Sequence, residues 1–328
     1  MSASMRFPSV WNDLNNENPG FMNVLSQSVR TMECRRPGLL PDLRQAKTLV
    51  VGSDYGGQHA AARFEAFSFI IADVEPCVEW AKRRRLLRDV ALSDGRRLEY
   101  KSLKDRKRQA VLLPFLAIAN ELPGLLVSVL VDKEVSSLFG EGSAFKKGDL
   151  RLGELAGWSP SVAEKFLRIV HLLSFFLAGL SAPGQHVFWI SDQDEIVANQ
   201  ARLYRCVELL AHIASNYLPH SLGTLRVSTT ASDTGSRDLE DFVAIPDLVC
   251  GALVDAISGM KSAGPLPVSE IIRPLSVNLS LKAKAIVEWL SDDSQPLRRL
   301  VYLIDEEPGL KRLRATCLHF GPLPGPTD

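Results

Sequence analysis

Short apolar runs alternate with longer amphipathic segments between Lys47 and about Met260. The short runs are rich in β-branched and aromatic residues, whereas the longer segments repeat apolar residues at helical spacing. The predicted strands are 47–53, 64–73, 96–101, 125–131, 186–191 and 224–229. The predicted helices are 75–90, 105–120, 159–180, 198–217 and 238–258. This alternation is typical of an α/β domain, in which the first three strands can form an antiparallel sheet.

The two ends of the chain have a different composition. Residues 1–46 carry four prolines around one amphipathic stretch, which predicts an arm that packs on the main domain. Residues 261–328 begin with a Pro- and Gly-containing linker, followed by a predicted helix at 280–291 and two apolar stretches separated by a turn. We therefore expect an N-terminal arm at 1–46, an α/β domain at 47–260, and a linker with a small helix-hairpin extension at 261–328.

Charge gives no overall attraction to nucleic acid or to a membrane surface. The 328 residues include 38 basic and 38 acidic side chains, so the formal net charge is zero. Two basic runs, at 82–88 and 101–108, are local exceptions. At helical spacing such runs are more typical of a solvated face than of a phosphate-binding groove. Any contact with nucleic acid therefore has to come from a local patch.

Cysteine usage and hydropathy favour a cytoplasmic protein without a membrane segment. The five cysteines are widely scattered and form no CxxC pair, which argues against structural zinc and against a disulfide framework. The first 18 residues lack the apolar core of a signal peptide. The longest apolar stretch, Ile169 to Leu180, is interrupted by His171 and Ser174 and is too short to span a bilayer. It is predicted to be a buried helix.

Acidic residues stand at or near the ends of several predicted elements. Asp54, Asp132 and Asp192 end apolar strands, Glu99 lies on the predicted third strand, and Asp247 lies in the last helix of the domain. Adjacent strands that end in carboxylates crowd negative charge at one edge of a sheet, and a cation relieves it. The pattern therefore indicates a divalent-metal site of the kind that phosphodiester chemistry requires.

The same order of strands and acids resembles a known family. The matching stretches are Ser53-Asp54-Tyr55-Gly56, Leu98-Glu99-Tyr100-Lys101, Leu130-Val131-Asp132-Lys133, Ile190-Ser191-Asp192, and Ala244 to Ala252. In this order they are similar to the motifs of the bacterial and phage family called domain of unknown function 3800, which has a ribonuclease H-like fold. Tyr55 stands where the family usually has Glu, and Pro246 stands just before the helical Asp247. Because proline disrupts a helix interior, we expect the helix to start or kink at Pro246.

The resemblance implies a ribonuclease H-like mixed central sheet flanked by helices, with an acidic site. Asp54, Asp192 and Asp247 would bind Mg²⁺ or Mn²⁺, and Asp132 and Glu99 would complete the catalytic cluster. Hard oxygen ligands suit these ions. Two ions about 3.5–4 Å apart would activate a water and stabilise the leaving oxygen.

The resemblance also implies residues that contact the substrate. Lys101 and Lys133 would hold the scissile phosphate, and Asp194 is a reserve metal ligand if the strand that carries it ends later than predicted. The predicted function is a divalent-metal-dependent nuclease or related phosphodiesterase that acts on nucleic acid.

Each acid also has a purely structural interpretation. Asp54 before Tyr-Gly-Gly suits a turn, Asp247 suits a partnered position in a buried helix, and Glu99 with Lys101 suits an outward-facing pair on a strand. The alternative function is a catalytically silent ribonuclease H-like module that serves interactions or an accessory role in defence. The two hypotheses differ in whether Asp54, Asp192 and Asp247 converge within reach of one metal ion in the structure.

Overall fold

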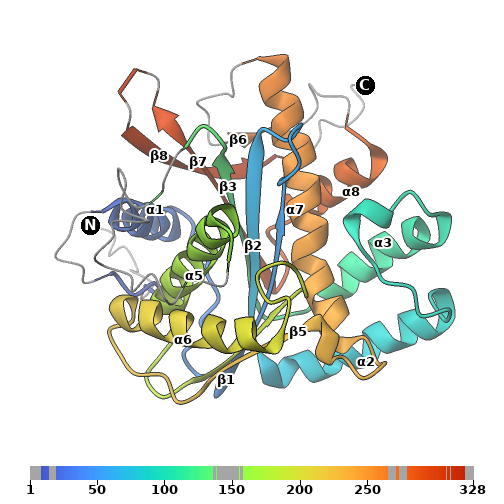
Figure 1. Ribbon diagram of the computed structural model, residues 1–328. Coiled ribbons are helices and arrows are strands. Elements are labelled where there is room, and N and C mark those ends of the chain that lie inside the picture. Colours follow the sequence, from blue (N-terminus) through green and yellow to red (C-terminus); the bar gives the residue numbers. More distant parts are fainter. Residues whose placement is uncertain are drawn as a thin grey trace, which may run out of the picture.

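A mixed eight-stranded sheet with helices on both faces forms the body of the protein (Figure 1). The computed structural model describes residues 9–14, 20–135, 138, 155, 158–264, 271–272, 279–307, 309–310 and 312–321. The predicted α/β class is confirmed. Most of the stretch expected as a linker, from Pro265 onward, lies outside the described residues, as does much of the arm before Phe21.

The sheet has the strand order β5-β4-β1-β2-β3-β7-β8-β6. The strands are β1 (Thr48–Gly56), β2 (Phe64–Asp73), β3 (Gly124–Asp132), β4 (His186–Ser191), β5 (Leu225–Thr229), β6 (Ile271–Ile272), β7 (Leu297–Glu307) and β8 (Arg312–Phe320). β1, β2 and β3 are antiparallel neighbours, while β4 runs parallel to β1 and β5 parallel to β4. The strands β1, β4 and β5 therefore end at the same edge of the sheet.

In the part of the chain that the structure describes, seven helices cover the two faces of this sheet. One face carries α1 (Phe21–Arg35), α5 (Pro160–Leu180) and α6 (Gln200–Tyr217), and the other carries α2 (Val74–Ala91), α3 (Arg106–Ala119), α7 (Asp238–Ala263) and α8 (Leu281–Leu290). Figure 1 shows the two groups on opposite sides of β2. The alternation of side chains along β1 explains the two cores. Leu49 and Val51 pack towards α5, whereas Val50 packs towards α7.

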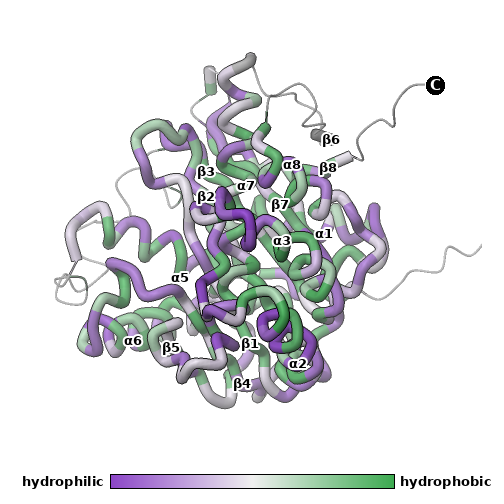
Figure 2. The backbone as a smooth tube through the Cα atoms, turned by 90° about the vertical axis from the view of Figure 1, so that its right-hand side faces the viewer, coloured by the Kyte–Doolittle hydropathy of each residue, from purple (hydrophilic) through white to green (hydrophobic). Residues whose placement is uncertain are grey.

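Hydrophobic segments gather in the middle of the molecule and hydrophilic turns lie outside (Figure 2). The helix α5 is the clearest case, because Ile169, Phe175, Phe176 and Leu177 are fully buried. The sequence-based expectation of a buried helix at 169–180 is therefore confirmed. The helix α7 is long and apolar enough to cross a membrane, but 72% of its most apolar 18-residue stretch is buried inside the protein. This burial is typical of a core helix.

The predicted third strand at 96–101 is wrong. Residues 96–99 are extended without sheet pairing, and they lead into the short 3₁₀ helix η1 (Tyr100–Ser102). The third antiparallel strand is instead β3, which pairs with β2 from Phe64–Asp132 to Ala72–Gly124. The helices α2 and α3 are thus inserted between the second and third strands. Local alternation in this short segment was outweighed by tertiary packing, since Leu98 and Tyr100 are buried against helices rather than strands.

The C-terminal hairpin is part of the main sheet. The sequence predicts a small helix-hairpin extension after a linker, and α8, β7 and β8 do form. However, β7 pairs in parallel with β3 over eight residue pairs, from Gly124–Leu297 to Val131–Ile304. The hairpin therefore widens the sheet on the side away from β1.

The N-terminal arm lies against the face that carries α5. The Trp11 ring packs against Phe175 in a tilted arrangement with ring centroids 5.2 Å apart, and its Nε1 donates a hydrogen bond of 2.9 Å to Ser26 Oγ. Gly179 of α5 permits this approach, because a Cβ there would lie 2.2 Å from the Trp11 ring. The arm thus completes the core on this side.

Candidate acidic active site

Three parallel strands bring one row of polar residues to the same edge of the sheet. Ser53 of β1 pairs with Ser191 of β4, and Ser191 pairs with Thr229 of β5. The next residue after each of these is Asp54, Asp192 and Thr230, respectively. Because side chains alternate between the faces, all three point to the face that carries α7. Two of the predicted acids are therefore neighbours across adjacent strands.

One side of α7 faces this row. Glu240, Val243, Ala244 and Asp247 follow the spacing of a single helix face, and all four line the same cavity as Asp54 and Asp192. The helix runs through Pro246 without ending there, so the start that the sequence predicts at this proline does not occur. Asp247 consequently lies in the middle of α7 and faces the end of β1.

The cavity has a volume of about 530 Å³ and is rich in charge. Seven carboxylates and three cations line it. The carboxylates are those of Asp54, Glu99, Asp192, Asp194, Glu195, Glu240 and Asp247, and the cations are Arg97, Lys101 and Lys165. The predicted residues Asp54, Glu99, Asp192, Asp247, Lys101 and Asp194 therefore come together from four separate segments of the chain.

The short helix η1 is held against α7 by close contacts. The backbone N–H of Tyr100 donates a hydrogen bond of 2.6 Å to Asp247 Oδ2, and the Tyr100 hydroxyl donates one of 2.5 Å to Asp255. Gly251 makes room for the ring, because a Cβ there would lie 2.1 Å from it. On the other side, Lys282 Nζ of α8 lies 3.7 Å from the Tyr100 ring centroid and donates to its carbonyl. These contacts fix Glu99 and Lys101, which flank Tyr100, at the rim of the cavity.

Crowding of the carboxylates raises two pKa values. Burial raises the pKa of Asp54 well above its usual range, and the charges of Asp247 and Asp192 raise it further. Burial also raises the pKa of Asp247 to about 6, although the hydrogen bond from Tyr100 N lowers it in part. A proton is one way to relieve such crowding, and a cation is another.

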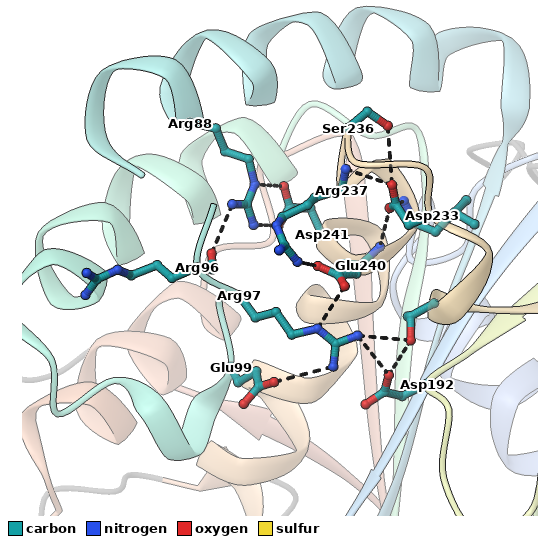
Figure 3. A network of polar contacts seen from close by, with 12 residues as sticks. Arg88, Arg96, Arg97, Glu99, Asp192, Asp233, Ser236, Arg237, Glu240 and Asp241 are labelled. Carbon is teal, nitrogen blue, oxygen red and sulfur yellow. Dashed lines mark hydrogen bonds and ion pairs between the residues drawn. The ribbon is translucent and has the colours of Figure 1, made fainter. Parts of the chain in front are cut away.

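Arg97 lies between the carboxylates of the cavity (Figure 3). Its Nε donates a hydrogen bond of 2.9 Å to Glu240, and its Nη atoms lie 3.7 Å from Glu99 and 3.7 Å from Asp192. Asp192 in turn accepts hydrogen bonds from the Thr230 hydroxyl and from the backbone N–H of Gln193. Asp192 is therefore oriented by three neighbours.

A second cation, Lys165 of α5, approaches the cavity from the other face of the sheet. Its Nζ lies 3.1 Å from Asp194 and 3.4 Å from Glu195. It also lies 5.5 Å from the ring centroid of Tyr55, whose hydroxyl bonds to Ser53. Tyr55 therefore places an aromatic ring and a partnered hydroxyl where the resembling family usually has a carboxylate.

Two predicted site residues lie elsewhere. Asp132 is buried and paired with Arg63, with Asp132 Oδ1 2.9 Å from Arg63 Nε. Lys133 Nζ donates to the carbonyl of His59. Neither side chain lines the acidic cavity. The reason is the strand order, because β2 separates β3 from β1, and Asp132 stands four residues beyond the level of Asp54.

The basic run at 82–88 is largely structural. Arg84 and Arg88 are buried and bind Asp241 of α7, and Arg84 and Arg85 also bind Asp238. These contacts pin the first turn of α7 to α2. Lys82 and Arg83 remain half exposed, but they pair with Glu79 and Glu121.

Sequence reasoning missed Arg97, Lys165, Thr230 and Glu240. Glu240 had a usable signal, because it stands seven residues before Asp247 and so shares its helix face. Thr230 had one too, because it follows a predicted strand in the same way as Asp192. Arg97 and Lys165 had none, since each reaches the cavity only through the tertiary packing of α2, η1 and α5.

The carboxylates of the cavity have the right chemistry for a hard divalent cation, but they are not arranged around a single ion position. Asp54, Asp192 and Asp247 offer oxygen ligands only, as Mg²⁺ and Mn²⁺ prefer. Across the part of the chain that the structure describes, however, no group of three or more His, Cys, Asp or Glu residues is arranged to hold a metal ion. Ion binding would therefore need side-chain rotation, for which the open cavity leaves room.

Comparison with known proteins adds no assignment. The sequence matches no protein-family model and none of the curated proteins. The function has to be inferred from the site itself.

Proposed function

We propose that the protein is a divalent-metal-dependent nuclease or related phosphodiesterase that acts on nucleic acid through the acidic cavity. The observation that carries the proposal is the convergence of Asp54, Asp192 and Asp247 at one end of β1. These acids come from the first strand, the fourth strand and the last helix of the central unit. Their meeting in one cavity is what a functional cluster requires, and it is the main support for the proposal.

We further propose that the central unit is a ribonuclease H-like domain related to the family called domain of unknown function 3800. The support is the element order, which the resemblance also implies. Three antiparallel strands (β1, β2, β3), with α2 and α3 inserted between β2 and β3, are followed by a helix, a fourth strand, a helix, a fifth strand and a last helix. The cytoplasmic setting belongs to the same proposal, and five free cysteines support it.

Each side chain has a defined task in the proposed reaction. Asp54, Asp192 and Asp247 would hold Mg²⁺ or Mn²⁺. When bound, the ions supply the charge that activates a water and stabilises the leaving oxygen. Glu99 lies at the rim, where its charge adds to the attraction for cations. Thr230 orients Asp192 through its hydroxyl.

A catalytically silent module is the second candidate, and one observation favours it. Arg97 already places a positive charge beside Asp192, Glu99 and Glu240. Because Arg97 stabilises the acidic cluster without any metal, the protein could fold even if it had no catalytic activity.

The test is a pair of measurements on the wild-type protein and on Asp54→Asn. With Mn²⁺ at about 100 times its Kd, mass action should stabilise the wild-type fold by about 2.7 kcal/mol and raise its Tm by several degrees. The variant should stay folded, show no Mn²⁺ shift, and lose cleavage of single- and double-stranded DNA and RNA.

Lys133→Gln is the matched control, because Lys133 bonds to a backbone carbonyl outside the cavity. It should keep both the Mn²⁺ shift and the cleavage. A wild-type protein with no Mn²⁺ shift and no cleavage of any substrate would favour the silent module instead.

A further inference from the structure

Arg97 is anchored at one end of its guanidinium group. Its Nε donates a hydrogen bond of 2.9 Å to Glu240 Oε1, and Glu240 is itself held by Arg237. Figure 3 shows this chain of contacts, with Arg97 extending from the segment before η1 towards α7. The anchor leaves both Nη atoms directed into the cavity.

The two Nη atoms are only loosely engaged. Nη2 lies 3.3 Å from Thr230 Oγ1 and 3.7 Å from Asp192 Oδ1, and Nη1 lies 3.7 Å from Glu99 Oε1. N–H···O hydrogen bonds usually measure about 2.7–3.2 Å, so the contacts with the two carboxylates are ion pairs rather than hydrogen bonds. The Nη atoms carry four N–H groups between them. The Arg97 side chain is also 38% exposed, so a ligand in the cavity can reach it.

The other two cations of the cavity are less suited to a phosphate. Lys165 is almost buried and already lies close to both Asp194 and Glu195. Lys101 is 83% exposed and lies 3.4 Å from Glu99 at the rim, where a flexible ammonium group gives little orientation. Arg97 offers a planar fork with a fixed direction, which matches two oxygens of one phosphate.

We infer that Arg97 binds the phosphate group of the nucleic acid through its two Nη atoms, and that Glu240 is the positioning residue that sets the direction of the fork. This inference rests on the proposed function. Seven carboxylates repel a phosphate, so the cavity needs a fixed cation as well as metal ions. An ion on Asp192 would neutralise that carboxylate and leave Nη2 to donate to the phosphate.

The experiment measures binding of a fluorescently labelled single-stranded DNA oligonucleotide by anisotropy, with Ca²⁺ as the added ion, over a series of salt concentrations. The proteins compared are the wild type, Arg97→Gln, Arg97→Lys, Glu240→Gln and the control Lys284→Gln, whose half-exposed lysine lies on α8 outside the cavity lining. Both Arg97 variants should bind about tenfold more weakly or worse, whereas Lys284→Gln should change binding by less than about threefold.

The salt dependence separates a phosphate contact from a structural effect. Arg97→Gln should reduce the slope of log K against log salt by about one contact, which is about 0.7 for single strands. Arg97→Lys should keep most of the slope but not the affinity, because the charge remains while the fork is lost. Glu240→Gln should weaken binding at an unchanged slope, since Arg97 keeps its charge but loses its direction.

The outcomes distinguish the inference from the proposed function. Wild-type affinity and slope in Arg97→Gln, together with an intact Mn²⁺ shift and intact cleavage in the wild type, overturn the inference alone. Absence of the Mn²⁺ shift and of cleavage in the wild type overturns the proposed function. Because Arg97→Lys retains the positive charge among the carboxylates, it keeps the test valid if Arg97→Gln does not fold.

Discussion

Two aspartates on α7, six positions apart, stand in opposite electrostatic situations. Asp241 is buried and held by Arg84 and Arg88, with Arg84 Nη1 2.7 Å from its Oδ2. The Asp247 carboxylate instead accepts a hydrogen bond from the backbone N–H of Tyr100. The first aspartate is neutralised by side chains of the protein. The second shares a cavity with other carboxylates, and its pKa is raised to about 6.

The difference shows which acids serve the fold and which are available for a ligand. A buried carboxylate with a built-in cation contributes to the unique position of α7 on α2, and nothing else has to bind it. A carboxylate crowded by Asp54 and Asp192 lowers the stability of the metal-free fold, a cost that a bound cation would reverse. The same helix thus carries a structural end and an acidic middle that faces the cavity.

The largest expected effect comes from the structural end. Asp241→Asn leaves the buried charge of Arg88 without a carboxylate partner, whereas Arg84 keeps Asp238. We expect the free energy of unfolding to fall by about 3–5 kcal/mol, because an unpaired buried charge costs that much. Urea unfolding followed by circular dichroism measures the loss.

Asp238→Asn is the control for this pair, because Asp238 is 30% exposed, its partner Arg85 is half exposed, and its other partner, the buried Arg84, keeps Asp241. Its loss should be nearer 1 kcal/mol. Equal losses for the two variants would mean that burial does not set the strength of these contacts.

A substitution in the middle of α7, at Asp247, is expected to raise stability rather than lower it. The folded pKa of Asp247, about 6, lies above its usual value of 3.8. The folded protein therefore binds more protons than the unfolded chain between about pH 4 and pH 6, and stability falls as pH rises through this window. Asp247→Asn keeps an acceptor for Tyr100 N, so it should raise stability by about 1–3 kcal/mol at pH 8 and by almost nothing at pH 4. Thermal melts at the two pH values measure the gain.

Asp42→Asn is the counterpart with the reverse dependence. The pKa of Asp42 is lowered, chiefly by its hydrogen bond with Arg44, so this pair contributes stability above the unfolded pKa and loses it as pH falls. The pair is exposed, and its removal should cost only a few tenths of a kcal/mol at pH 8. A destabilised Asp247→Asn at pH 8 would contradict the crowding of carboxylates.

A smaller effect is expected where α8 supports the cavity rim. Lys282→Ala removes the contact of the ammonium group with the Tyr100 ring and its hydrogen bond to the Tyr100 carbonyl. We expect a loss of about 1 kcal/mol in the free energy of unfolding. Tryptophan fluorescence during urea unfolding measures it. Lys284→Ala is the control, because Lys284 lies two residues further along α8 and is half exposed. It should lower stability less than Lys282→Ala. A larger loss for Lys284→Ala would show that the Tyr100 contact is unimportant.

The smallest effect is expected at Lys133. Its side chain makes an exposed hydrogen bond to the carbonyl of His59. Lys133→Gln should change the free energy of unfolding by no more than about 0.5 kcal/mol. A loss of several kcal/mol in a chemical unfolding curve would assign it a structural role that the described contacts do not contain.

The sequence predicted most elements because their patterns are local. The alternation in β1 and the apolar length of α5 depend on neighbours in the chain, and both elements formed as expected. It also predicted that Asp54, Asp192 and Asp247 share a site, because strand-ending acids meet when parallel strands share an edge.

The sequence failed where partners are distant in the chain. The segment 96–101 has strand composition, but β3 occupies the position beside β2, and Tyr100 is instead held by α7 and α8. Asp132 ends a strand as Asp54 does, yet β2 lies between them, and only the strand order reveals this. Lys165 and Arg97 reach the cavity from elements whose packing no local pattern specifies.

The parallel pairing of β7 with β3 has a consequence for biosynthesis. All nine residues of β3 are buried in the finished sheet, and one edge of this apolar strand is covered only by β7, which is synthesised long after it. Until β7 arrives, the ribosome-bound chain presents an unpaired hydrophobic strand edge, which is a template for wrong pairing with other chains. Productive folding on the ribosome therefore depends on how long the nascent β1–β3 sheet can stay soluble or shielded by a chaperone before its last neighbour is made.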